Sequence, residues 1–104
     1  MPENYTRVAV LGDLKPGRMR CARIGDRRIL LANVDGAIFA TDELCTHEEH
    51  SLCNGSLRGE LVSCSLHGSR FSVRTGQPQE DPASEPLRTY PVRIEGDAIL
   101  VGVL

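Results

Sequence analysis

The sequence has few aromatic residues and no tryptophan, and this limits what the chain can bind or catalyse by itself. Among its 104 residues, only Tyr5, Phe39, Phe71 and Tyr90 carry aromatic rings. A pocket for an organic substrate is hard to build from so few rings, and so is a platform for stacking nucleic-acid bases. We therefore expect that the chain is not itself an enzyme and that nucleic acid is not among its partners.

Long apolar runs and an excess of positive charge are also missing. Apolar runs such as Ile29–Ala32 are far shorter than a membrane span, and the first residues lack the basic and apolar regions of a signal peptide. The net charge of -2 argues against a general nucleic-acid binder. These absences predict a cytoplasmic protein without a membrane partner. Because thiols stay reduced there, the four cysteines are better interpreted as metal ligands or spare thiols than as a disulfide framework.

Short alternating segments separated by turn signals predict an all-β, mostly antiparallel fold. The dipeptide Asp35-Gly36 lies between two apolar runs and is a strong hairpin signal, and Glu95-Gly96-Asp97 separates another such pair. The length of 104 residues fits a single domain. The expected strands cover residues 7–11, 19–24, 28–34, 37–41, 60–64, 70–73, 90–94 and 98–103.

Two mixed pairs of metal-binding residues stand out in the middle of the chain. Cys45 and His47 form one pair, and Cys64 and His67 form the other. Two such arms could bind one zinc ion, or a [2Fe–2S] core with both thiolates on one iron and both imidazoles on the other. Zinc fingers usually pair like ligands locally, so the unlike pairing favours two loops that each reach both irons.

The motifs Cys45-Thr46-His47 and Cys64-Ser65-Leu66-His67-Gly68 resemble the Rieske signature. Segments such as 71–76 are also similar to soluble Rieske ferredoxins, so the resemblance covers essentially the whole chain. It implies a Rieske fold, in which an antiparallel β sandwich or barrel carries a small, loop-rich cluster-binding subdomain. The single domain would span residues 1–104, with the subdomain at about residues 41–73.

The resemblance also implies the cofactor and its ligands. The chain would bind one Rieske-type [2Fe–2S] cluster, with Cys45 and Cys64 on the inner iron. His47 and His67 would bind the outer, more exposed iron. Ser69 matches a serine that donates a hydrogen bond to cluster sulfur in high-potential relatives, whereas Phe71 replaces their tyrosine donor. We therefore expect a low reduction potential, although not the lowest of the Rieske range.

Two further positions indicate the type of Rieske protein. Respiratory members carry an extra cysteine in each ligand loop, and the two form a disulfide, but here those places hold His50 and Leu66. What remains resembles the ferredoxin component of bacterial aromatic-ring-hydroxylating dioxygenase systems. Such ferredoxins pass single electrons from an NAD(P)H-dependent flavoprotein reductase to a separate Rieske non-haem iron terminal oxygenase. The alternatives are a small Rieske-like subunit of an assimilatory nitrite reductase and a zinc-binding interaction module.

The remaining cysteines and the third histidine have ordinary interpretations. Cys21 lies on a predicted strand and is expected in the core. Cys53 is expected to be a small loop residue, because two sulfur and two nitrogen donors already complete the site. For His50 we expect a surface or hydrogen-bonding role rather than metal binding.

Charged and rigid segments flank the predicted ligands. Four acidic residues close to His47 suit the docking of a basic partner surface. Prolines in the loop over residues 77–87 suit a rigid lid that limits solvent access. The acidic residues are Asp42, Glu43, Glu48 and Glu49, and the prolines are Pro78, Pro82 and Pro86.

Overall fold

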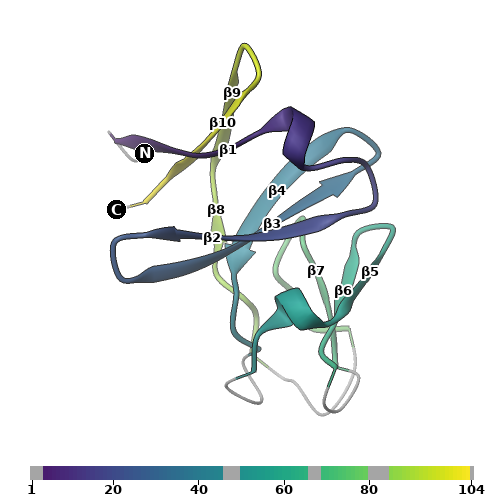
Figure 1. The fold of residues 1–104 in the computed structure, drawn as a ribbon. Coiled ribbons are helices and arrows are strands. Elements are labelled where there is room, and N and C mark those ends of the chain that lie inside the picture. Colours follow the sequence, from purple (N-terminus) through teal and green to yellow (C-terminus); the bar gives the residue numbers. More distant parts are fainter. Residues whose placement is uncertain (1–3, 46–49, 66–68, 80–84, 104) are drawn as a thin grey trace.

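The chain folds almost entirely into β-strands (Figure 1). The computed structural model describes residues 4–45, 50–65, 69–79 and 85–103. All strand pairings within these ranges are antiparallel, which confirms the predicted all-β class. No helix in these ranges has the length and hydropathy needed to cross a membrane. The strands are β1 (Tyr5–Val10), β2 (Met19–Ile24), β3 (Arg27–Val34), β4 (Ala37–Asp42), β5 (Ser56–Arg58), β6 (Leu61–Ser63), β7 (Arg70–Ser72), β8 (Thr89–Tyr90), β9 (Val92–Glu95) and β10 (Ala98–Gly102), and the two short 3-10 helices are η1 (Leu11–Asp13) and η2 (Leu52–Asn54).

Two sheets form the larger part of the molecule, with strand orders β1-β10-β9 and β2-β3-β4-β8. β3 is buried on both faces, and its successive side chains enter two different cores. Ile29 and Leu31 pack in one core, whereas Leu30 and Ala32 pack in the core that contains the two predicted cysteine ligands. This explains why β3 is a continuous apolar run instead of an alternating one. β3 therefore connects the packing of the scaffold to that of the site.

A third, smaller sheet has the order β5-β6-β7. Together with η2, it lies within residues 41–73, the segment predicted to bind the cluster. Figure 1 shows η2 and β5–β7 at the opposite end of the molecule from the two chain termini. The predicted site and the termini are thus well separated.

Turn chemistry explains most of the strand boundaries. Asp35 and Gly36 both have positive φ, 52° and 97°, as a two-residue hairpin of this kind requires. The predicted strand at 90–94 is interrupted at Pro91, which has no N–H to donate and separates β8 from β9. β5 was not predicted, because it is a three-residue edge strand whose residues are half-buried at most.

Candidate functional site

The first predicted ligand, Cys45, lies at the start of a loop closed by backbone hydrogen bonds. Its N–H donates to the carbonyl of His50 at 3.0 Å, and Leu44 forms an isolated antiparallel bridge with Ser51. One step further out, the N–H of Leu52 donates to the carbonyl of Glu43 at 2.8 Å. We call residues 45–50 the first ligand loop. Its two ends are therefore fixed to each other like the arms of a hairpin.

Cys64 begins an equivalent loop between β6 and β7. Its N–H donates to the carbonyl of Ser69 at 2.8 Å, so both cysteines donate to the residue five positions later. We call residues 64–69 the second ligand loop. Gly55, which follows η2, approaches the carbonyl of Ser63 so closely that a Cβ atom would overlap it. The backbone after the first loop thus packs directly on the strand that leads into the second.

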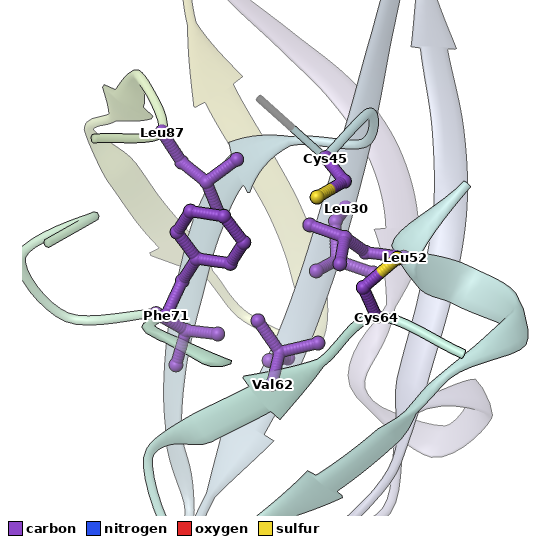
Figure 2. Close-up of a cluster of buried hydrophobic side chains, with 9 residues drawn as sticks. Leu30, Cys45, Leu52, Val62, Cys64, Phe71 and Leu87 are labelled. Atoms are coloured by element: carbon purple, nitrogen blue, oxygen red, sulfur yellow. The ribbon is translucent and has the colours of Figure 1, made fainter. Parts of the chain in front are cut away.

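The two cysteine side chains come together in one buried cluster. Cys45 is 4% exposed and Cys64 is 3% exposed, and both pack with Leu52 and Leu30. Figure 2 shows the two sulfur-bearing side chains on the side of the cluster nearest Leu52, with Phe71 on the other side. Two thiols from separate loops therefore share one apolar environment, an arrangement that suits the thiolate-bound half of a Rieske cluster.

A buried hydroxyl group tests whether such a cluster fits the site. Ser69 is fully buried, and its Oγ has no hydrogen-bond partner in the part of the chain that the structure describes. A buried hydroxyl without a partner costs about 1–3 kcal/mol. A cluster sulfur at the second ligand loop would accept this hydrogen bond. The site therefore fits the cofactor that the cysteines suggest.

The two predicted histidine ligands, His47 and His67, lie outside the described residues, as does Leu66. Their assignment as ligands stays a prediction.

His50 forms a side-chain link between the two ligand loops. Its Nε2 lies 2.9 Å from the Oγ of Ser65. The predicted hydrogen-bonding role of His50 is thus confirmed, and it occupies the position where respiratory Rieske proteins carry a disulfide cysteine. Sequence reasoning missed Ser65, although its place directly after Cys64 puts it in the loop that faces His50.

The predictions for Cys21 and Cys53 are wrong. Cys21 is exposed on β2, the edge strand of its sheet, and it is joined to Cys53 by a disulfide. The expectation that both remain spare thiols fails because the fold places η2 against β2. One signal could have found the pair. Once two of the four cysteines are assigned to the cluster, the remaining two are candidates for each other.

One of the four acidic residues predicted to form a docking face, Glu43, is not available for docking. Glu43 is buried, 5% exposed, and forms two hydrogen bonds with the guanidinium of Arg28, at 3.3 and 2.5 Å. Burial alone would raise the pKa of Glu43, but hydrogen bonds from Arg28 and Ser51 and the charge of Arg28 outweigh it and lower the pKa. Glu43 is therefore a structural residue and is removed from the docking face.

Asp42 also has an internal partner, since it accepts a hydrogen bond from the hydroxyl of Tyr90. Burial, together with this bond to a carboxylate, raises the pKa of Tyr90. Glu48 and Glu49 lie outside the described residues, as does Pro82. The docking prediction now depends on these two glutamates.

Comparison with known protein families leads to the same type of site as the two cysteine loops do. The model of the Rieske [2Fe-2S] domain family matches residues 4–91. The chain belongs to the Rieske [2Fe-2S] family. This confirms the predicted cofactor type and the Rieske fold, and it leaves no support for the zinc module.

Similar proteins are named as ferredoxins or as ferredoxin components. The ferredoxin component of biphenyl 2,3-dioxygenase from Rhodococcus jostii (strain RHA1) is 44% identical, with 92% of this chain and 90% of the relative covered. The structure of the ferredoxin of Sphingomonas yanoikuyae B1 has a TM-score of 0.92 at 31% identity, covering 97% of this chain and all of that one. The chain is therefore a Rieske-type ferredoxin, and the prediction that it is an electron carrier and not an enzyme is confirmed.

Two more structures bear on partners and alternatives. A complex of reduced oxygenase and oxidised ferredoxin in carbazole 1,9a-dioxygenase contains a chain similar to this one, with TM-score 0.89, 31% identity, and 94% and 92% of the two chains covered. A structure described as the putative small subunit of an NADPH nitrite reductase has TM-score 0.81 at 23% identity, with 96% and 99% covered. At that identity the second likeness shows the fold alone, so the ferredoxin interpretation is favoured.

Proposed function

We propose that this protein is the ferredoxin component of an aromatic-ring-hydroxylating dioxygenase system in the cytoplasm. It would accept one electron at a time from an NAD(P)H-dependent flavoprotein reductase and pass it to a terminal Rieske non-haem iron oxygenase. The observation that carries this proposal is the pair of buried cysteines, Cys45 and Cys64. Each begins a loop that is closed by a backbone hydrogen bond to the residue five positions later. Relatives named as components of such systems support it.

For the cofactor we propose the ligand set Cys45, His47, Cys64 and His67, within a cluster-binding subdomain of about residues 41–73. The bound [2Fe–2S] cluster supplies a site that takes up and releases one electron. The chain's own residues hold the two thiolates apart from water and close each loop by a backbone bond. Leu52 and Phe71, both fully buried, pack in the cluster of side chains that contains Cys45 and Cys64.

The hydroxyl of Ser69 should set part of the reduction potential. A hydrogen bond to sulfur favours the reduced, more negative form, so Ser69→Ala should lower the potential. A hydrogen bond to a charged group is worth about 1.5–3 kcal/mol, which corresponds to a shift on the order of 60–130 mV. Phe71→Tyr should raise the potential by restoring a second donor. Voltammetry of the purified holoproteins measures both changes.

A buried serine on the neighbouring strand provides the control. The Oγ of Ser72 already accepts hydrogen bonds from the N–H groups of Arg74 and Thr75. Ser72→Ala should therefore leave the potential within about 20 mV of wild type, since no donor to sulfur is lost. Equal shifts in the Ser69 and Ser72 variants would show that the hydroxyl of Ser69 has no special role.

Electron exchange with the reductase tests the function directly. With NADH and a flavoprotein reductase of a dioxygenase system, we expect rapid reduction of the ferredoxin, and reoxidation when the terminal oxygenase is added. Glu48 and Glu49 should steer a basic partner surface, and exposed charges are screened over about 8 Å at physiological salt. The rate should fall as ionic strength rises. Glu48→Gln with Glu49→Gln should lower the association rate about tenfold and flatten this salt dependence.

A matched variant removes two negative charges at the other end of the molecule. Glu95 and Asp97 are exposed at the β9–β10 hairpin, which Figure 1 shows far from η2 and β5–β7. Glu95→Gln with Asp97→Asn should keep the wild-type salt dependence in stopped-flow reduction. If both double variants behave alike, net charge and not a docking face controls the rate. Failure of any such reductase to reduce the protein would contradict the proposed function.

A further inference from the structure

A surface disulfide joins the scaffold to the segment that leaves the first ligand loop. Cys21 of β2 and Cys53 of η2 are 32 residues apart in sequence, and their Cα atoms are 6.1 Å apart, within the usual range for a disulfide. Cys21 is exposed and Cys53 is half-buried. The bond is therefore within reach of small thiols and disulfides in solution.

The disulfide is connected to the site through the residues next to Cys53. Leu52 is fully buried and packs in the same cluster as Cys45 and Cys64. The Oγ of Ser51 accepts a hydrogen bond from the N–H of Cys53 at 3.2 Å and lies 3.9 Å from the Sγ of Cys21. A movement of η2 away from β2 would therefore pull on the wall of the cysteine site.

A metal ion is a less suitable occupant of this place than a disulfide. A carboxylate oxygen of Glu43 lies within 4.8 Å of both sulfur atoms, which would give three donors to a soft metal. That carboxylate, however, is already held by the guanidinium of Arg28 through two hydrogen bonds. Recruiting it would leave the guanidinium without its anionic partner, whereas the disulfide forms without disturbing this pair.

We propose that Cys21 and Cys53 are a reversible thiol–disulfide pair whose oxidation slows the loss of the cluster. A low-molecular-weight disulfide such as oxidised glutathione is the oxidant. One cysteine attacks it, which forms a mixed disulfide and releases one glutathione thiol. The other cysteine then displaces the second glutathione and closes the Cys21–Cys53 bond. Two protein thiols are oxidised, one glutathione disulfide is reduced to two thiols, and the two cysteine protons end on those thiols.

The expected effect follows from the segment that the bond encloses. The closed loop runs from residue 21 to residue 53 and contains the first ligand loop. Such a link restricts the opened states of the chain, whereas it leaves the closed state as it is. Leu52 is buried in the same cluster of side chains as Cys45 and Cys64, so we expect release of the cofactor to involve opening at Leu52. The disulfide should make that opening rarer. This inference rests on the proposed ligand set.

Alkylation of the denatured protein tests whether the pair is reversible. Holoprotein is incubated with oxidised or with reduced glutathione, freed of the small thiols, and alkylated in denaturant. Mass spectrometry should show all four cysteines modified after reduction. After oxidation, Cys21 and Cys53 should be protected. Equal modification after both treatments would overturn the proposal.

Retention of the cluster tests the consequence. After the same two treatments, an iron chelator is added and the visible absorbance is followed. The oxidised form should lose its colour roughly threefold to tenfold more slowly than the reduced form. Cys21→Ser should decay at the rate of reduced wild type after either treatment. Because the two wild-type samples need no substitution, the test holds even if this variant folds poorly.

Equal decay rates in oxidised and reduced wild type would overturn the proposed role of the pair. A protein that binds no cluster after either treatment would instead contradict the ligand set and the proposed function. The alkylation pattern would still test the disulfide in that case. The two failures are therefore distinguishable.

Discussion

Proteins with Cys45→Ser or Cys64→Ser should be purified without a [2Fe–2S] cluster. We expect wild type to contain about two irons and two acid-labile sulfides per chain, and each variant to contain almost none. Each substitution removes one of the two thiolates proposed for a single iron. Serine is a poor replacement, because its hydroxyl lacks the low pKa and the soft sulfur that the thiolate offers.

Loss of the cluster should also loosen the two ligand loops. Cys45 and Cys64 lie in the same buried cluster as Leu52 and Phe71, so an empty site would leave polar serine among apolar side chains. Because metal binding and local folding are coupled, amide hydrogen exchange should rise at η2 and β5–β7 more than in β1, β9 and β10. Iron analysis, sulfide analysis and exchange measurements on the same samples would show this.

The chain contains its own control for the cysteine substitutions. Cys21→Ser combined with Cys53→Ser makes the same chemical change twice, but at the two cysteines that lie outside the proposed ligand set. This variant should still assemble about two irons per chain, although it should lose them faster in a chelator than oxidised wild type does. A double variant without iron, next to a Cys45 variant that keeps it, would refute the ligand set. One zinc per chain in wild type would also refute it.

Much of the scaffold could be predicted because it depends on local signals. The Asp35-Gly36 turn depends on neighbouring residues, and both residues have the positive φ that it requires. The bounds predicted for β2, residues 19–24, also agree with the structure, although its burial does not alternate strictly. β5 could not be predicted in this way. Its three residues pair with β6, and Leu57 packs against the core around Cys45 and Cys64, but no pattern within Ser56–Arg58 reveals either partner.

The site could be predicted where a motif carries the chemistry and not where distant residues meet. The signature around Cys45 and Cys64 is contiguous in sequence, whereas the Cys21–Cys53 bond depends on how η2 packs against β2. The Arg28–Glu43 pair lies between these cases. β3 and β4 pair up to Ile29 with Asp42, so continuing the register by one residue places Arg28 opposite Glu43. Extending the predicted hairpin would have shown Glu43 to be structural.

Replacing Glu43 by glutamine should destabilise the protein appreciably. The side chain of Glu43 is 6% exposed and that of Arg28 is 43% exposed, so the pair is shielded on the glutamate side. The Glu43→Gln substitution would keep the shape of the side chain but remove its charge, leaving the guanidinium without its anion. We expect the free energy of unfolding to fall by about 1–3 kcal/mol, which corresponds to a decrease of roughly 5–15 °C in the midpoint of thermal unfolding. Circular dichroism of the holoproteins measures it.

A second ion pair of the same chemistry provides the comparison. Arg74 and Glu60 are 2.9 Å apart, but their side chains are 58% and 44% exposed. Water and salt screen such a pair, so Glu60→Gln should lower the free energy of unfolding by less than about 0.5 kcal/mol.

The Glu43 variant should also lose iron faster than wild type in a chelator. Glu43 lies two residues before Cys45, and its main-chain carbonyl accepts a hydrogen bond from the N–H of Leu52. Equal stability of the two variants would mean that the buried pair does not hold the entry to the first ligand loop. A change in the salt dependence of reduction by the reductase in the Glu43 variant alone would return that residue to the docking face.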